Sequence, residues 1–121
     1  MSDSTTTLAD LRNLVQRFVE ERDWRQFHSP KNLSMSLAIE AAELMEHFQW
    51  IDLPESRAIK DQGEKLAHVR EELADVLCYA LALANELEID LSAAVRDKMV
   101  KNAAKYPAEQ SRGRYDPPPK S

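Results

Sequence analysis

Two pairs of acidic residues share one spacing, and their carboxylates suit a hard divalent cation. Glu40 and Glu43 form one pair, and Glu72 and Asp75 form the other. The second member of each pair follows the first by three positions, which places both side chains on one face of a helix. If the two faces met, four like charges would converge, raise one another's pKa values and oppose folding. Mg²⁺ prefers oxygen ligands and usually retains water, so it would relieve that repulsion.

The two segments that carry these acids show a narrow polar stripe on an otherwise apolar helix. The polar positions are Ser36, Glu40, Glu43 and His47 in residues 31–50, and His68, Glu72, Asp75 and Tyr79 in residues 64–88. An ordinary surface helix has the inverse pattern, with one apolar stripe on a polar cylinder. Two interpretations stay open. Each stripe is the solvated face of a half-buried helix, or the stripes face each other around a metal ion.

Hydrophobic spacing predicts four helices that hold these residues in place. They begin near Thr7, Lys31, Glu64 and Leu91 and end near Arg22, Trp50, Glu88 and Lys105. Thr7 with Asp10, Ser29 with Pro30, and Asp90 supply the expected starts of three of them. Residues 52–63 read as a loop with a short helical turn. The predicted fold class is all-α, as a four-helix antiparallel bundle that oligomerises through its helices.

Length and composition bound the remaining possibilities. A chain of 121 residues predicts one domain over residues 7–107, with a disordered start at 1–6 and a Pro-rich flexible tail at 108–121. The formal net charge of -5 argues against nucleic-acid polymers and anionic membranes as partners. Cys78 is the only cysteine, so an intrachain disulfide and a zinc site built from cysteines are excluded, and we expect Cys78 in the core. Neither a signal peptide nor a membrane span is visible, which predicts a cytoplasmic protein.

Three other kinds of protein also contain paired carboxylates or helical bundles, and they are alternatives to a protein with a magnesium site. Di-iron carboxylate bundles need Glu-x-x-His on two helices, and no such pair occurs in this chain. Glycosidases also use two carboxylates, but their sites normally lie in larger folds with a cleft. A non-enzymatic binding or adaptor bundle stays open as the alternative.

The order of the motifs resembles a known family. Glu40-Ala-Ala-Glu43, a gap of 28 residues and then Glu72-Leu-Ala-Asp75 is similar to the signature of the MazG-like all-α nucleoside triphosphate pyrophosphohydrolases. The segment 22–33 is similar to the dCTP pyrophosphatase branch, as are 48–50 and 105–107. The resemblance covers residues 8–107. One departure is Ile39, where many relatives carry a further acid, while Glu71 precedes the second motif.

The resemblance implies a function. It implies hydrolysis of a deoxynucleoside triphosphate, dCTP or modified dCTP, to the monophosphate and pyrophosphate, in housekeeping of the nucleotide pool. The same chemistry on dUTP or a damaged purine dNTP stays open. It implies Mg²⁺, for which Mn²⁺ could substitute, bound by Glu40, Glu43, Glu72 and Asp75. One of these acids or Glu71 would take the proton from the attacking water. Homodimers or homotetramers, with sites completed across subunits, are also implied.

Several further residues are candidates for contact with the nucleotide. Lys98, Asn102 and Lys105 share one helical face and could meet phosphates, although a solvated basic face is the commoner role. Trp24 and Trp50 could stack on the base, or anchor the edge of the core. Tyr79 could contact the deoxyribose or bond to the backbone. His28 and Asn32 could bond to the base or a phosphate, or brace the loop. His47 and His68 are expected beside the metal ligands or in solvent.

Overall fold

The computed structural model describes residues 1–114, and every regular element in that range is a helix. The all-α prediction is therefore confirmed for these residues. The chain divides into two compact units, Met1–Glu88 and Ile89–Ser121. The end of the predicted tail, with its three consecutive prolines, lies outside the described residues.

The first unit contains three long helices and three short helical segments. The elements are α1 (Leu8–Glu21), η1 (Arg25–Phe27), α2 (Pro30–Glu46), α3 (Leu53–Ala58), η2 (Ile59–Asp61) and α4 (Gly63–Leu87). The predicted starts of α1 and α2 are confirmed. Thr7 and Asp10 form a reciprocal capping box, and Ser29 caps α2 with Pro30 as its first residue. Each cap satisfies backbone N–H groups that have no partner within the helix.

The end of α2 differs from the prediction, because the helix stops at Glu46 rather than at Trp50. The backbone N–H of His47 donates to the carbonyls of both Leu44 and Met45, which tightens the last turn. Turns follow, and Asp52 then caps α3. Trp50 consequently lies in a connection and not on the helical face that carries the acids.

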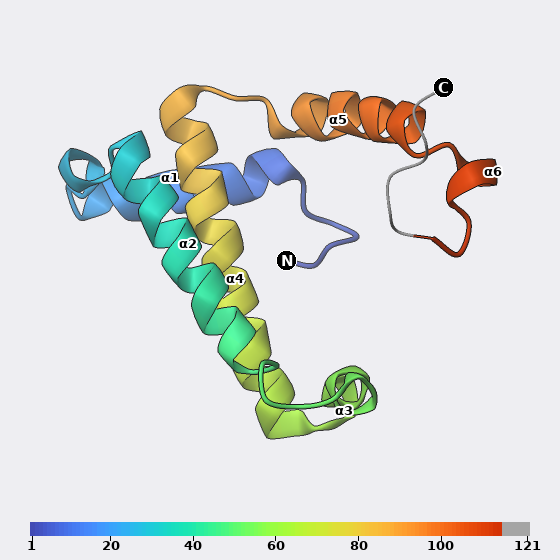
Figure 1. The fold of residues 1–121 in the computed structure, drawn as a ribbon. Coiled ribbons are helices and arrows are strands. Elements are labelled where there is room, and N and C mark those ends of the chain that lie inside the picture. The colour runs from blue at the N-terminus through green and yellow to red at the C-terminus, as the bar shows by residue number, and fades with distance from the viewer. Residues whose placement is uncertain (115–121) are drawn as a thin grey trace. The chain divides into compact units, whose positions relative to one another are not determined.

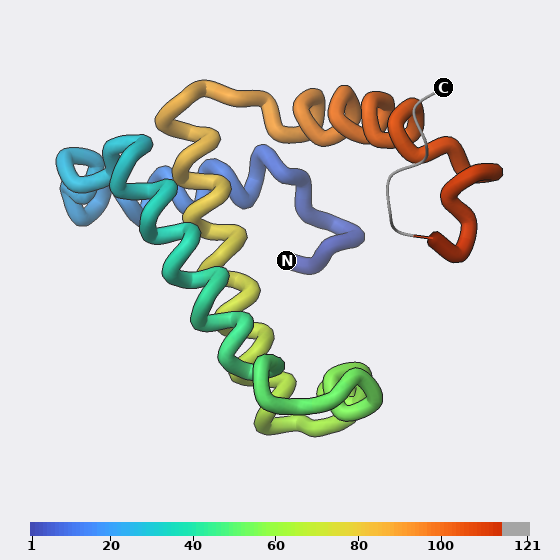
Figure 2. The backbone as a smooth tube through the Cα atoms, viewed as in Figure 1, coloured from blue at the N-terminus to red at the C-terminus, as the bar shows by residue number. Residues whose placement is uncertain are grey.

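Helices α2 and α4 pack side by side and antiparallel, and they form the frame of the first unit (Figure 1). Helix α1 crosses them near the start of α2 and the end of α4, while α3 lies at the opposite end of the pair (Figure 2). Within the first unit, α1 is the other long helix that packs against this pair, and it does so at one end of the seam.

Buried side chains gather where α1 crosses the other two helices. Val19, Leu33, Leu81, Ala82 and Ala84 are all buried at this end. Ile59 is buried separately, in the short segment that packs against α4. Among the described residues, no helix is long and apolar enough to cross a bilayer.

Polar contacts lock α1 onto the last turns of α4. The side chain of Asn85 accepts a hydrogen bond from Arg12 Nε (3.0 Å) and donates one to the Arg12 carbonyl (3.1 Å). Arg12 Nη2 also donates to the carbonyl of Ala84 at 3.2 Å. Arg25 Nε lies 3.3 Å from Glu86 Oε1 and ties the segment after α1 to the same helix.

Large apolar side chains elsewhere on α2 and α4 remain exposed. They include Ile39, of which 59% is exposed, and Leu73, of which 56% is exposed. Helices that are mostly apolar around their circumference are usually buried on several sides. Within the first unit α2 and α4 are covered mainly along their shared seam and by α1.

The second unit contains α5 (Leu91–Lys105) and α6 (Ala108–Ser111). Asp90 caps α5 as predicted, accepting a hydrogen bond from the backbone N–H of Ala93 at 3.0 Å. The segment expected to be a flexible tail thus begins with one helical turn. At the other terminus, residues 2–5 form a turn held by hydrogen bonds between Ser2 and Thr5.

Replacing Asn85 with alanine should destabilise the first unit. The change removes both bonds between the Asn85 side chain and Arg12, so we expect the free energy of unfolding to fall by about 1–3 kcal/mol. Urea unfolding measures the loss. Asn13→Ala, an exposed asparagine on α1, is the matched control and should change stability by less than about 0.5 kcal/mol. Equal effects of the two changes would contradict the locking role.

Candidate metal centre and adjoining pocket

Three carboxylates meet in the seam between α2 and α4. Glu40 and Glu43 on α2 and Glu72 on α4 each present an oxygen, and these oxygens all lie within 4.8 Å of one another. All three side chains are half-buried. Oε2 of Glu40 and Oε2 of Glu72 are buried without a hydrogen-bond partner. Unpartnered carboxylate oxygens are costly inside a protein, so this arrangement favours a bound proton or a bound cation.

The electrostatic consequence is visible in the pKa values of the cluster. Burial, a hydrogen bond with Glu43 and the charges of Glu43, Asp75 and Glu72 raise the pKa of Glu40 from 4.5 to about 7. Burial and the proximity of Glu43 and Asp75 also raise the pKa of Glu72, while His47 acts in the opposite direction. Carboxylates that are partly desolvated and close to like charges resist ionisation.

The other two predicted acids lie outside this tight group. Asp75 is exposed, yet its charge contributes to the raised pKa values of both Glu40 and Glu72. It therefore lies at the edge of the cluster, one turn along α4 from Glu72. Glu71 is also exposed, and it lies next to Glu72 in sequence but on a different side of the helix.

These residues fit a hard divalent cation. The donors are oxygen atoms alone, and two of them have no hydrogen-bond partner among residues 1–114. Positive charge would offset their mutual repulsion. Mg²⁺, Mn²⁺ and Ca²⁺ favour such oxygen sets, whereas softer metals favour nitrogen and sulfur.

A largely apolar pocket of about 550 Å³ adjoins the cluster. Its wall is formed by Leu14, Val15, Phe18, Val19, Trp24, His28, Asp75, Cys78, Tyr79 and Ala82. Asp75 belongs to both the pocket and the charged neighbourhood of the acids. The volume lies in the usual range for sites that bind small molecules. The pocket therefore combines a largely apolar wall with a charged end at Asp75.

Trp24 is held in this wall by aromatic neighbours. Its ring meets Phe18 edge to face with 5.5 Å between centroids, and His28 lies 6.4 Å away. The guanidinium of Arg22 lies 3.8 Å from the centre of the Phe18 ring. An indole fixed in this way offers a surface on which a planar base could stack.

Asn32 lies beside the pocket rather than in its wall. Its side-chain nitrogen donates to the carbonyl of Phe27 at 3.1 Å, and its backbone N–H donates to Ser29 Oγ. These bonds brace the loop before α2, which is one of the two roles considered for Asn32. Asn32 therefore supports the segment between Trp24 and α2.

Trp50 lies far from Trp24 within one chain. It follows α2, whereas the pocket lies by the start of α2, and the 14 residue steps from Asn32 to Glu46 span about 21 Å. Its side chain is 87% exposed. One copy of the first unit therefore does not bring the two tryptophans together.

The three predicted phosphate contacts lie in the second unit. Lys98, Asn102 and Lys105 are all on α5, at the four- and three-residue steps that place them on one face. Asn102 Nδ2 lies 3.8 Å from Met99 Sδ, and Lys105 Nζ lies 5.3 Å from the centre of the Tyr106 ring. Their role as phosphate contacts stays a prediction.

The expectation that Cys78 is a core residue is wrong. Cys78 is exposed and lines the pocket. Desolvation, followed by the nearby charge of Asp75, raises the pKa of its thiol, so the neutral form is favoured. One feature of the sequence could have indicated that Cys78 lies near the acids. Cys78 follows Asp75 by three positions, which places both side chains on neighbouring parts of one helical face.

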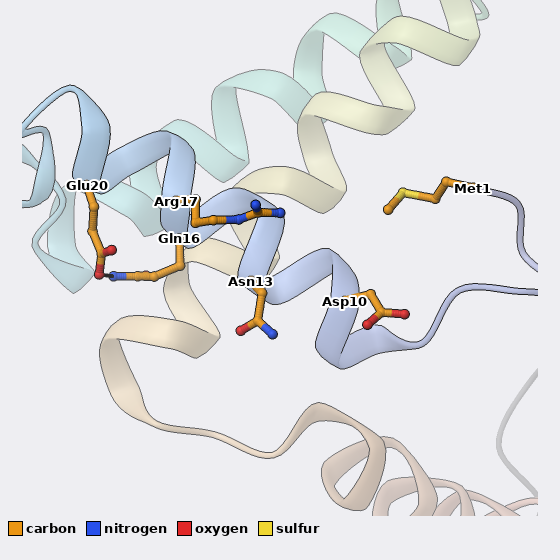
Figure 3. Close-up of a pocket in the computed structure, with 6 residues that line it drawn as sticks. All are labelled: Met1, Asp10, Asn13, Gln16, Arg17 and Glu20. Carbon is orange, nitrogen blue, oxygen red and sulfur yellow. Dashed lines mark hydrogen bonds between the residues drawn. The ribbon is translucent and has the colours of Figure 1, made fainter.

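Sequence reasoning also missed the contribution of α1 to the pocket. Leu14 and Phe18 belong to the apolar stripe that predicted this helix, but a stripe does not reveal whether it covers a core or a cavity. A second hollow, lined by Met1, Asp10, Asn13, Gln16, Arg17 and Glu20, lies along another side of α1 (Figure 3). Five of its six lining residues are polar or charged, and none of the six is a predicted site residue.

Comparisons with known proteins identify a family and several similar chains. A family model described as MazG-like matches residues 35–115. A pyrophosphatase from Archaeoglobus fulgidus, whose crystal structure is known, has 37% identity and a TM-score of 0.76, over 88% of this chain and 98% of that one.

Two mammalian proteins are similar over most of this chain. The dCTP pyrophosphatase 1 of Rattus norvegicus is 46% identical over 107 residues, and that of Homo sapiens is 44% identical over 106 residues. Each match covers 88% of this chain. The matched part spans 63% of the length of the rat protein and 62% of the length of the human protein. Because the MazG-like model matches residues 35–115, which is more than half of the sequence, the chain belongs to the MazG-like family.

Proposed function

We propose that this protein hydrolyses a deoxynucleoside triphosphate, with dCTP or modified dCTP preferred, to the monophosphate and pyrophosphate. One observation carries the proposal. Three half-buried carboxylates with two unpartnered oxygens lie next to an apolar aromatic pocket. The names of the similar proteins, a pyrophosphatase and dCTP pyrophosphatase 1, support the same reaction. The cytoplasmic nucleotide pool would supply the substrate.

Mg²⁺ is the cation proposed for the acidic cluster, with Mn²⁺ as a substitute. Glu40, Glu43, Glu72 and Asp75 would hold it, and when bound it would neutralise phosphate charge and acidify water. The reaction is an attack of water on the α-phosphorus. A new bond forms from the water oxygen to phosphorus, and the bond to the oxygen that bridges the α- and β-phosphates breaks. An acid of the cluster, or Glu71, takes the proton of the water.

The base would occupy the pocket beside the cluster. Trp24 would stack on it, His28 would meet its polar edge, and Tyr79 would lie near the deoxyribose, because all three line the pocket. Asp75 joins the pocket to the acids, so a nucleotide bound there has its α-phosphate near them. Lys98, Asn102 and Lys105 are proposed to meet the phosphates from α5.

A second copy of the chain is proposed to complete each site. Trp50 is too distant from the pocket of its own chain, and α2 and α4 expose Met35, Ile39, Met45, Leu73 and Leu77. Association through these helices would bury that apolar surface. It would also allow Trp50 of one copy to reach the pocket of the other. The oligomer would be a homodimer or a homotetramer.

Removing a carboxylate of the cluster should stop the reaction. We expect Glu43→Gln and Glu72→Gln to lower pyrophosphate release from dCTP at least about a hundredfold, because each removes a charged ligand. A panel of dNTPs with pyrophosphate detection makes the measurement. Glu46→Gln, an exposed glutamate on α2 outside the cluster, is the control and should retain activity.

Two outcomes would count against the proposed function. Wild-type protein that releases no pyrophosphate from any dNTP with Mg²⁺ would refute it. Full activity in the Glu43→Gln variant would refute the assignment of the cluster, and a non-enzymatic adaptor would then become the better interpretation.

The raised pKa of Glu40 predicts how stability depends on pH. Without divalent cations, the free energy of unfolding should fall as pH rises from 4.5 to about 7, because the folded protein holds a proton that the unfolded chain releases. Mg²⁺ should stabilise the fold more at about pH 8 than at about pH 5, since protons compete with the cation. Urea unfolding at both pH values, with and without Mg²⁺, measures this.

Glu40→Gln isolates the contribution of this one carboxyl. The variant should lose the part of the pH dependence that Glu40 supplies, so the difference between wild type and variant reports that group alone. If the free energy of unfolding of the wild type instead rose relative to that of the variant between pH 4.5 and about 7, this result would contradict the raised pKa of Glu40.

Subunit complementation tests the shared site. Trp24→Ala and Trp50→Ala should each weaken dCTP binding. If Trp50 acts in the partner's pocket, then mixed dimers of the two variants recover wild-type sites, up to about a quarter of the total in an equal mixture. Activity of the co-refolded mixture is compared with each variant refolded alone. No recovery would contradict the exchange of Trp50 between copies.

A further inference from the structure

The site residues lie in a fixed order along the seam between α2 and α4. The pocket lies around Asp75, Tyr79 and Ala82 of α4, and the acidic cluster is centred on Glu72. His68 comes one turn earlier on α4, about 6 Å from Glu72 along the axis. Since the pocket and His68 lie on opposite sides of the cluster, a ligand that runs from the pocket past the acids approaches His68.

A second histidine faces His68 from α2. His47 and His68 are nearly parallel, with 6° between their planes and 6.3 Å between their centroids. His47 lies one turn beyond Glu43 and close enough to Glu72 to affect its pKa. The two imidazoles thus form a pair that bridges both helices at the far end of the acids.

The surroundings of this pair leave it open to a ligand. The side chain of His68 is 58% exposed, and its nearest acidic group is Glu64 Oε1, at 3.9 Å from Nε2. That separation is too long for a hydrogen bond. His47 is half-buried between the cluster and His68. Each ring carries at least one N–H, because imidazole remains a donor in its neutral form.

We propose that His47 and His68 bind the β- and γ-phosphates of the substrate, and hence the pyrophosphate that leaves. This inference rests on the proposed function, which places the base in the pocket and the α-phosphate at the acids. The remaining phosphates then extend along the seam towards the histidine pair. Anionic oxygens accept charge-assisted hydrogen bonds, and the imidazole N–H groups can donate them. The pair therefore selects triphosphates over monophosphates.

Direct binding of the two products tests the assignment. Pyrophosphate with Mg²⁺, and separately dCMP with Mg²⁺, are titrated into the full chain by calorimetry. We expect His47→Leu and His68→Leu each to weaken pyrophosphate binding about tenfold and to change dCMP binding less than about twofold. His47→Gln and His68→Gln keep an N–H donor, so they should recover part of the loss.

His28→Leu provides the matched comparison. It removes the third imidazole of the chain, which lines the pocket, so it should weaken dCMP binding and leave pyrophosphate binding nearly unchanged. If His47→Leu and His68→Leu weakened the binding of pyrophosphate and of dCMP equally, the inference would be overturned, because this result would indicate a general role of the histidines in the fold. Unchanged pyrophosphate affinity, or a wild type that does not bind pyrophosphate, would also overturn it.

The proposed function and this inference fail in different ways. Binding is measured without turnover, so a protein that bound pyrophosphate at the histidine pair but released none from dNTPs would refute the function alone. A protein that hydrolysed dCTP normally after both leucine substitutions, with an unchanged KM, would refute the inference alone.

Discussion

Mutual repulsion of carboxylates in the seam between α2 and α4 is the constraint on which the first unit depends. Glu40, Glu43 and Glu72 are held within a few ångströms by two long helices, and two of their oxygens have no partner. Burial of apolar side chains cannot satisfy these atoms. The helices must therefore be fixed elsewhere, and the charge must be neutralised by protons or by a cation.

The arrangement of burial shows how the helices are fixed. Val19, Leu33 and Leu81 are buried where α1 crosses, and Asn85 links Arg12 to the end of α4. This end supplies stability, while the middle of the seam holds the acids. Fixed helices keep the carboxylates together even though they repel, which is the condition for a preorganised cation site. The pocket lies between the two regions and uses side chains from both.

Sequence reasoning predicted the parts of this design that periodicity encodes. Residues three and four apart share a face, so the stripes of Glu40 with Glu43 and of Glu72 with His68 could be found without coordinates. Helix caps were equally readable, because Thr7, Ser29 and Asp90 are local signals. The single domain over residues 7–107 and the four-helix bundle stay predictions, as the structure describes two units.

Tertiary relationships could not be predicted in the same way. A helical wheel shows on which face of a helix a residue lies, but not which residues of a neighbouring helix lie beside it. The sequence alone therefore could not show that Trp24 and Trp50 of one chain lie far apart. Cys78 was assigned to the core because small apolar residues usually lie there. The structure places it at a cavity, since α1 packs against α4 with a gap beside Trp24.

The order of sites along one seam explains how an acidic chain could hold a polyanion in a single direction. An apolar aromatic pocket accepts an uncharged base, and the carboxylates beyond it repel phosphate unless a cation intervenes. The imidazoles of His47 and His68 lie past the acids and can donate hydrogen bonds without needing that cation. A nucleotide bound the other way round would place its base among charged groups and its terminal phosphates in an apolar pocket. Both placements cost desolvation energy, so the polarity of the seam favours one orientation of the proposed nucleotide.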